Sequence, residues 1–157
     1  MTIQDEQDWL GANQRHLSLE IAMLRTELTR HAARADGHHE PEGGRSEFEA
    51  LREERRTIQE RMPRPPALDD LCARFSLTPF ERQLLLLTAA VELDSAFGAL
   101  CAHAHGDTQR AYPTFGLALA ALHDPHWSAL LPNAALRYWH LIDFASPGGS
   151  PSAPLTS

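Results

Sequence analysis

With 157 residues, 43% of them hydrophobic, the chain has room for one domain with a buried core and an additional extension. Its net charge of −7 makes nucleic acid an unfavourable partner, and since all 14 basic residues are arginines, mechanisms that need a lysine are excluded, such as a Schiff base or a phosphate-loop lysine. The first residues are polar and acidic, and the longest nearly apolar run, residues 84–91, is far shorter than the roughly 20 residues of a membrane span, so we expect a cytoplasmic protein without a signal peptide.

Residues 2–35 have the pattern of an amphipathic helix. Leucine and isoleucine side chains recur at spacings of seven, four and three, which places them on one stripe of the helix: Leu10, Leu17, Ile21, Leu24 and Leu28. Two interpretations are open. Either Leu17, Ile21, Leu24 and Leu28 form a seam for self-association or for a partner, or the stripe belongs to one arm of a helical hairpin inside the chain.

A second helix is predicted after a break at residues 36–45, which is rich in glycine. Ser46 and Glu49 have the spacing of a capping box, in which each side chain bonds the other residue's backbone N–H. The two helices are expected to fold back on each other as an extension over residues 1–62. The proline-rich residues 63–66 are expected to link it to the next domain.

The histidines and cysteines do not indicate a metal site. His38 and His39 are adjacent in the glycine-rich break, with no second pair of ligands at metal spacing, so we expect them to be solvated. Cys72 and Cys101 lie in apolar helical patterns, which is typical of buried, reduced thiols. We therefore assign no metal, no cofactor and no catalytic residue.

The most apolar segment of the chain begins with a strong helix start. Thr78 and Glu81 have capping-box spacing, and Pro79 suits the first helical position, where no N–H donor is needed. Residues 84–91 are then apolar except for one threonine, which predicts a helix buried on most sides. We expect it to be the central element of a small helical domain over residues 67–145.

Shorter elements are predicted after this helix. Asp94 can cap a following helix that Gly106 ends, and Thr114 can cap another. Residues 136–144 alternate in character and are rich in β-formers, which favours a strand, although the pattern also allows a short helix.

A single strand needs a partner strand, and nothing upstream has the pattern of one. We therefore expect its mate beyond Ser157 or in another chain, which would make this chain a fragment. Residues 146–157 are rich in glycine, serine and proline, and we expect a flexible tail or linker there. The expected fold class is mainly α, a helical hairpin followed by a small helical domain with one C-terminal strand.

Three phrases resemble one family: LTPFERQLLLLTAAVELD, AYPTFGLALAALHDPHWSAL and the closing LRYWHLIDF. They are similar to the N-terminal winged-helix-type domain that precedes the ATPase module in AAA+ ATPases of bacterial contractile injection systems, the phage-tail-like particles. The resemblance implies a winged-helix-like fold and a place in an ATP-driven remodelling machine. It implies no catalytic residue here, because that family's ATPase motifs lie downstream of this domain.

The function expected from these observations is a non-catalytic interaction or regulatory domain of such an ATPase. Its partners would be proteins, either an AAA+ module or injection-system components, and Arg110, Tyr112 and Trp139 are candidates for an exposed contact surface. An alternative is a free-standing coiled-coil adaptor that forms a homo-oligomer through its first helix. A third possibility, a nucleic-acid-binding regulator, is disfavoured because residues 114–131 contain no arginine to neutralise phosphates.

Overall fold

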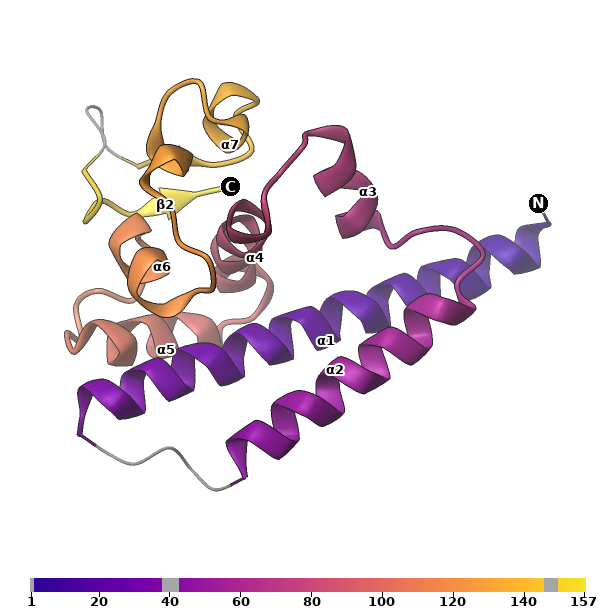
Figure 1. The fold of residues 1–157 in the computed structure, drawn as a ribbon, viewed down its shortest axis with the longest axis horizontal. Helices are drawn as coiled ribbons and strands as arrows, with labels where there is room; N and C mark the ends of the chain where they lie inside the picture. The colour runs from indigo at the N-terminus through magenta and orange to yellow at the C-terminus, as the bar shows by residue number, and fades with distance from the viewer. Residues whose placement is uncertain (1, 38–42, 146–149) are drawn as a thin grey trace.

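The fold is mainly helical, as the sequence predicts, in a computed structural model that describes residues 2–37, 43–145 and 150–157. Figure 1 shows the elements in chain order. They are α1 (Ile3–Ala35), α2 (Gly44–Arg61), α3 (Ala67–Arg74), α4 (Pro79–Leu93), α5 (Ala96–His105), α6 (Phe115–Ala121), the short 3₁₀ helix η1 (Trp127–Leu130), α7 (Ala135–Tyr138), β1 (Asp143–Phe144) and β2 (Leu155–Thr156). None of the described helices combines the length and the apolar character that crossing a bilayer requires.

The first two helices form the predicted antiparallel hairpin (Figure 1). The start of α2 differs from the prediction, because the helix begins at Gly44 and its N-cap, Gly43, makes no side-chain capping bond. Ser46 already lies inside the helix, so the predicted capping box with Glu49 is wrong. The assignment of His38 and His39 as solvated falls outside the described residues.

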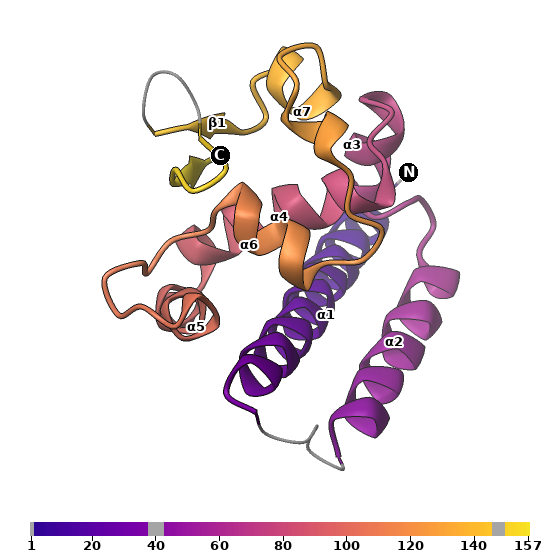
Figure 2. The same cartoon turned by 60° about the vertical axis from the view of Figure 1, so that its left-hand side comes forward.

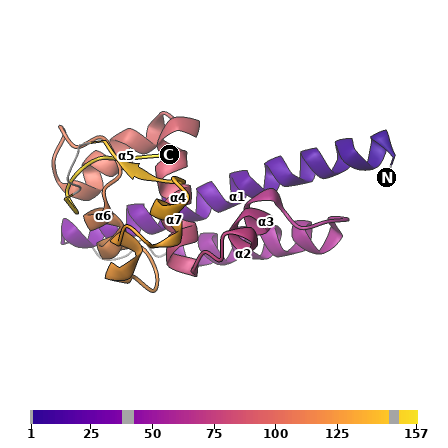
Figure 3. The same ribbon diagram turned by 90° about the horizontal axis from the view of Figure 1, so that it is seen from above.

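Helix α1 belongs to the hairpin and also to the core of the domain that follows. Its C-terminal half packs against α4, α5 and α6, and it buries Leu24, Leu28 and Ala32 in the same hydrophobic cluster as Phe80 and Leu84 of α4. Its N-terminal half projects beyond the cluster of α4 to α7 together with part of α2 (Figure 3). The hairpin is thus joined to the domain along about half of its length.

Helix α4 is the central element, as its composition predicts. The Thr78 hydroxyl accepts from the Glu81 backbone N–H at 3.2 Å, and the Glu81 carboxylate accepts from the Thr78 N–H at 2.8 Å, so the predicted capping box is confirmed. Its apolar residues Phe80, Leu84 and Leu87 are fully buried. Figure 2 shows α4 crossing α1, with α5, α6 and α7 arranged around it.

The C-terminal part differs from the prediction in two ways. The segment predicted as one strand is divided into α7 and the two-residue strand β1, and His140 between them has a positive φ of 52°, which turns the chain. The partner of β1 is β2 of the same chain, with Phe144 opposite Leu155, so the mate lies neither beyond Ser157 nor in another chain.

A third segment, residues 113–114, pairs with the small sheet. Thr114 forms a bridge with Pro154, and the Leu155 N–H donates to the Pro113 carbonyl at 3.0 Å. The order across the sheet is therefore residues 113–114, then β2, then β1. Residues 150–157, predicted as part of a flexible tail, are held against the domain, and Leu155 is buried; the rest of that predicted tail includes residues 146–149, which lie outside the described residues.

Candidate functional site

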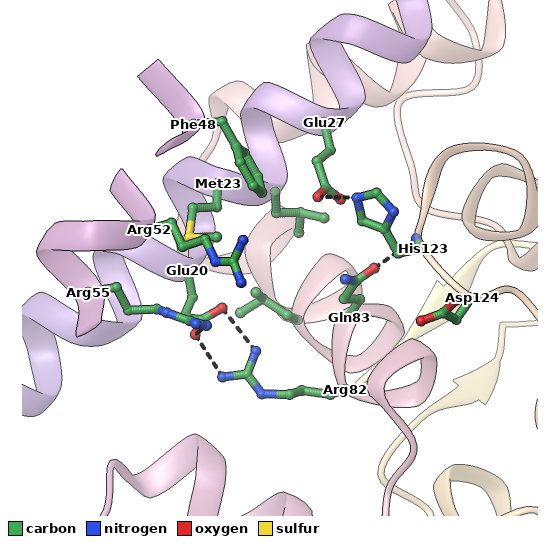
Figure 4. Close-up of a pocket in the computed structure, with 12 residues that line it drawn as sticks. Glu20, Met23, Glu27, Phe48, Arg52, Arg55, Arg82, Gln83, His123 and Asp124 are labelled. Atoms are coloured by element: carbon green, nitrogen blue, oxygen red, sulfur yellow. Dashed lines mark hydrogen bonds and ion pairs between the residues drawn. The ribbon is translucent and has the colours of Figure 1, made fainter. Parts of the chain in front are cut away.

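A cleft of about 330 Å³ lies where the hairpin meets α4. Figure 4 shows carboxylates from α1, guanidinium groups from α2 and α4, and His123 from the turn after α6 around it. Helix periodicity brings the α1 residues to one wall, because positions 20, 24 and 27 recur at spacings of four and three. The charged groups of the cleft therefore come from three helices and a turn.

Glu20 is the centre of an ion-pair network in this cleft. Its carboxylate accepts two hydrogen bonds from Arg82, at 2.9 and 2.7 Å, and one from Arg55, at 2.7 Å (Figure 4). Arg82 also donates to Asp69 of α3 at 2.8 Å. One buried carboxylate and one guanidinium thus connect α1, α2, α3 and α4.

The network keeps Glu20 ionised although it is buried. Burial acts to raise its pKa, but the hydrogen bonds and charge of Arg82 and then of Arg55 outweigh that effect and lower the pKa. Burial also acts to lower the pKa of Arg82, but its bonds to Glu20 and Asp69 raise it. Both partners therefore remain charged at neutral pH.

Glu27 has the opposite behaviour one heptad further along α1. Burial raises the pKa of its carboxyl group, and the nearby His123 opposes the shift only in part. His123 Nε2 lies 2.9 Å from the carboxylate, and the His123 backbone N–H donates to the Gln83 side chain at 3.1 Å, which fixes the turn (Figure 4). Glu27 thus forms an ion pair with a histidine, whereas Glu20 forms ion pairs with two arginines.

The chemistry of the cleft favours structural stabilisation. Its buried carboxylates are paired, Glu20 with Arg55 and Arg82 and Glu27 with His123, and no serine, threonine or cysteine lines it. Over the described ranges, no three histidine, cysteine, aspartate or glutamate side chains come together to hold a metal ion. The arrangement can lock the hairpin onto α4, and we assign it that role.

A different kind of surface lies at the end of α7. Tyr138 and Trp139 are 62% and 54% exposed, and their rings meet edge to face at 5.0 Å. Trp139 also contacts the ring of Phe75, the residue that ends α3, at 5.6 Å. We call these three residues the aromatic face.

A family model described as "winged helix domain, variant" matches residues 3–157. The chain belongs to this winged helix family. Comparison with curated proteins and with solved structures gave no match.

The topology agrees with a winged helix domain. Helices α6 and α7, with η1 between them, occupy the place of a helix–turn–helix unit, and the β1–β2 hairpin occupies the place of the wing. Two residues of the aromatic face, Tyr138 and Trp139, therefore lie at the end of the second helix of the helix–turn–helix unit. The arginine of α7, Arg137, is directed inward: it donates to the Leu130 carbonyl at 3.0 Å and lies 5.0 Å from the ring centre of Phe144.

Four of the predicted contact residues of this winged helix domain lie along α1. Leu17 and Ile21 are half-buried against the core, and Leu24 and Leu28 are 4% and 0% exposed. Their assignment to an exposed partner seam is therefore corrected for Leu24 and Leu28, because both side chains pack inside this chain. The stripe instead belongs to one arm of the helical hairpin inside the chain, the second of the two interpretations of the sequence.

The other three predicted residues lie at two places. Arg110 and Tyr112 are half-buried in the loop between α5 and α6, where Arg110 donates to the Ser152 carbonyl at 3.5 Å. The Tyr112 carbonyl lies 3.1 Å from Nε2 of His105, which must donate because a carbonyl can only accept. Trp139 belongs to the aromatic face instead.

Sequence reasoning missed Glu20, Arg82 and Tyr138. A signal for Glu20 existed, because it precedes Leu24 by four residues and so lies within the apolar stripe rather than on the solvated face. Arg82 carried no such signal, since its partners lie on other helices. The thiols agree with expectation only in part: both are free, Cys101 is buried, and burial raises its pKa to about 11, whereas Cys72 is half-buried.

Proposed function

We propose that this winged helix domain is a non-catalytic protein-interaction domain and that the aromatic face is its contact surface. The observation that carries the proposal is the exposure of Tyr138 and Trp139 side by side at the end of α7, the helix whose counterpart in many winged helix and helix–turn–helix proteins faces the bound partner. Large exposed aromatic side chains are enriched at protein interfaces and supply much of their binding energy.

The charge of this region favours a protein over nucleic acid. Arg137 is engaged with Leu130 and Phe144, so it does not extend toward solvent as a phosphate contact would. The whole chain carries a net charge of −7, which opposes approach to a polyanion.

A nucleic-acid-binding regulator is kept as the second candidate because the family's fold is compatible with it. This candidate function requires that the protein bind a nucleic-acid duplex, and that the affinity fall steeply as the salt concentration is raised. Fluorescence anisotropy with a labelled duplex at low salt tests it, and the absence of binding there removes this candidate.

The partner that we propose is the ATPase module of an AAA+ protein, or a component of the injection system it serves. Support comes from the resemblance of residues 77–94, 111–130 and 136–144 to the domain that precedes such modules. The adaptor alternative, a homo-oligomer held by α1, would need the outer surface of the hairpin, since Leu24 and Leu28 are buried.

The experiment begins by reading the gene downstream of codon 157. If the same frame encodes an AAA+ module, that module is produced separately and titrated with this chain by calorimetry. Trp139→Ser is expected to weaken binding at least ~10-fold, as the loss of an aromatic anchor does. The matched control is Leu93→Ser, since Leu93 is equally exposed but lies at the end of α4.

Each outcome bears on one part of the proposal. Absence of an ATPase module downstream overturns the association with such a motor. If the module binds and both variants weaken binding equally, the aromatic face is not the contact surface. Light scattering of the chain alone tests the adaptor, which predicts a defined oligomer.

A further inference from the structure

A groove of about 400 Å³ lies beside the aromatic face, between the N-terminal half of α1 and α3. Trp9, Leu71 and Phe75 supply its apolar surface, and Arg64 and Arg74 supply its charge. Because Phe75 also contacts Trp139 at 5.6 Å, the groove is continuous with the aromatic face. All five residues are at least partly exposed to solvent.

The groove is held open by bonds between its two walls. The indole Nε1 of Trp9 lies 3.3 Å from the carbonyl of Arg64 and 3.4 Å from that of Pro65, and it donates to both. Further along, the Ala67 N–H donates to the side chain of Asn13 at 2.7 Å. These bonds fasten the proline-rich link to α1, so the groove exists before a ligand arrives.

Arg64 is placed as a receptor for a carboxylate. The centre of its guanidinium group lies 3.7 Å from the ring centre of Trp9, a stacked position that leaves the N–H donors at its edge pointing outward. No carboxylate in residues 2–37, 43–145 or 150–157 forms an ion pair with it. A stacked guanidinium is already oriented for a two-pronged bond to a carboxylate.

Arg74 provides a second, partly used guanidinium at the groove. Its Nε donates to Asp70 at 2.8 Å, and within the described part of the chain its two terminal nitrogens make no hydrogen bond. Asp70 is the one acid that lines the groove, and Arg74 already neutralises it. In a chain of net charge −7, this groove is therefore locally positive.

We propose that the groove binds an acidic amphipathic peptide segment of a protein partner. Apolar side chains of the segment would cover Trp9, Leu71 and Phe75, and its carboxylates would pair with Arg64 and Arg74. The inference rests on the proposed function as a protein-interaction domain, and it specifies the chemistry of the segment that the domain binds. Charge complementarity selects an acidic segment over a basic one.

The test uses the full chain and two fluorescein-labelled 14-residue peptides. Both carry leucine and phenylalanine at helical spacing i, i+3, i+4 and i+7; one carries glutamate at the polar positions and the other carries lysine. Anisotropy should show binding of the glutamate peptide only, weakening as salt is raised. Trp9 emission, read in a Trp127→Phe, Trp139→Phe background, should change on binding.

Charge reversal identifies the residues responsible. Arg64→Glu is expected to lower the affinity for the glutamate peptide at least ~10-fold. Combined with Arg74→Glu, it should make the lysine peptide the tighter-binding ligand. Arg64→Lys keeps the charge but loses the planar guanidinium, so its affinity for the glutamate peptide should lie between those of the wild type and Arg64→Glu. The matched control is Arg52→Glu, which changes an arginine that is also exposed but lines the cleft of Figure 4 instead.

Three results would overturn the proposal: binding of neither peptide, equal binding of both, or the same loss from Arg52→Glu as from Arg64→Glu. Circular dichroism of each variant separates lost binding from lost folding. The proposed function is judged separately. If Trp139→Ser abolishes binding of the ATPase module while Arg64→Glu leaves it unchanged and the peptides fail to bind, the aromatic face stands and the groove does not.

Discussion

Arginines have opposite roles in two regions of this molecule, the cleft and the groove. In the cleft, Arg55 and Arg82 are bound by Glu20, and Arg82 by Asp69 as well. At the groove, Arg64 stacks on Trp9 without an acidic partner among the described residues. The same side chain therefore acts as a structural connector where the chain supplies its own acid, and remains available for a partner where it does not.

Burial explains why the two regions differ. A carboxylate taken out of water must be fully paired, so Glu20 requires Arg82 and Arg55, and the three helices that carry them are fixed relative to one another. An exposed guanidinium stays solvated and gains little from a partner in its own chain. Each prediction below tests one side of this contrast, starting with the largest expected effect.

Arg82→Met should destabilise the fold by about 3 kcal/mol, because it leaves Glu20 buried with Arg55 alone and removes the bond to Asp69. Urea unfolding at neutral pH measures the loss. Arg74→Met is the matched control: its side chain is 73% exposed against 19% for Arg82, and its loss should stay within about 0.5 kcal/mol. Equal losses for the two variants would contradict the contrast.

Glu20→Gln and Glu27→Gln should change stability in opposite directions as pH varies. The pKa of Glu20 is lowered on folding, so its contribution is present above the usual glutamate pKa, ~4.3, and is lost as pH falls through the folded pKa. The pKa of Glu27 is raised by burial, so its contribution is present below ~4.3 and is lost as pH rises through the folded pKa.

Above pH 6, Glu20→Gln should therefore be less stable than the wild type by about 1–2 kcal/mol, and this deficit should shrink in acid. Above pH 6, Glu27→Gln should be at least as stable as the wild type, and it should lose that advantage in acid. His16 lies 3.7 Å from Glu20, and burial lowers its pKa, so acidification below pH 6 also weakens the wild type. Urea unfolding between pH 3 and 8, compared with wild type at each pH, gives the two profiles; parallel profiles would refute the assignment.

Local signals in the sequence predicted local structure well. Thr78, Pro79 and Glu81 fix the start of α4 because a capping box involves only residues three apart. Thr114 and Gly106 likewise mark helix ends that the structure confirms, through a side-chain bond at one and a left-handed backbone at the other. The hairpin and the mainly helical class follow from periodicity in the same way.

Features that depend on contacts distant in sequence were not predicted. Glu20 and Arg82 are separated by 62 positions, and Arg64 reaches Trp9 across a comparable span, so no local pattern indicated either contact. The partner of β1 was missed because a two-residue strand in a segment rich in serine and proline has no alternation to detect. Tertiary packing decides these cases, and helix α7 shows that it can also override β-forming composition.

The smallest effect on stability is expected at the groove. Arg64→Met should cost about 0.5 kcal/mol or less, because it removes an exposed cation–π contact while the Arg64 carbonyl still accepts from the Trp9 indole. For a domain of this size the melting temperature should fall by no more than roughly 2 °C in a thermal scan followed by circular dichroism. A loss approaching that of Arg82→Met would mean that Arg64 is also a structural connector. Its guanidinium would then not be free for a partner's carboxylate, and the contrast between the two regions would disappear.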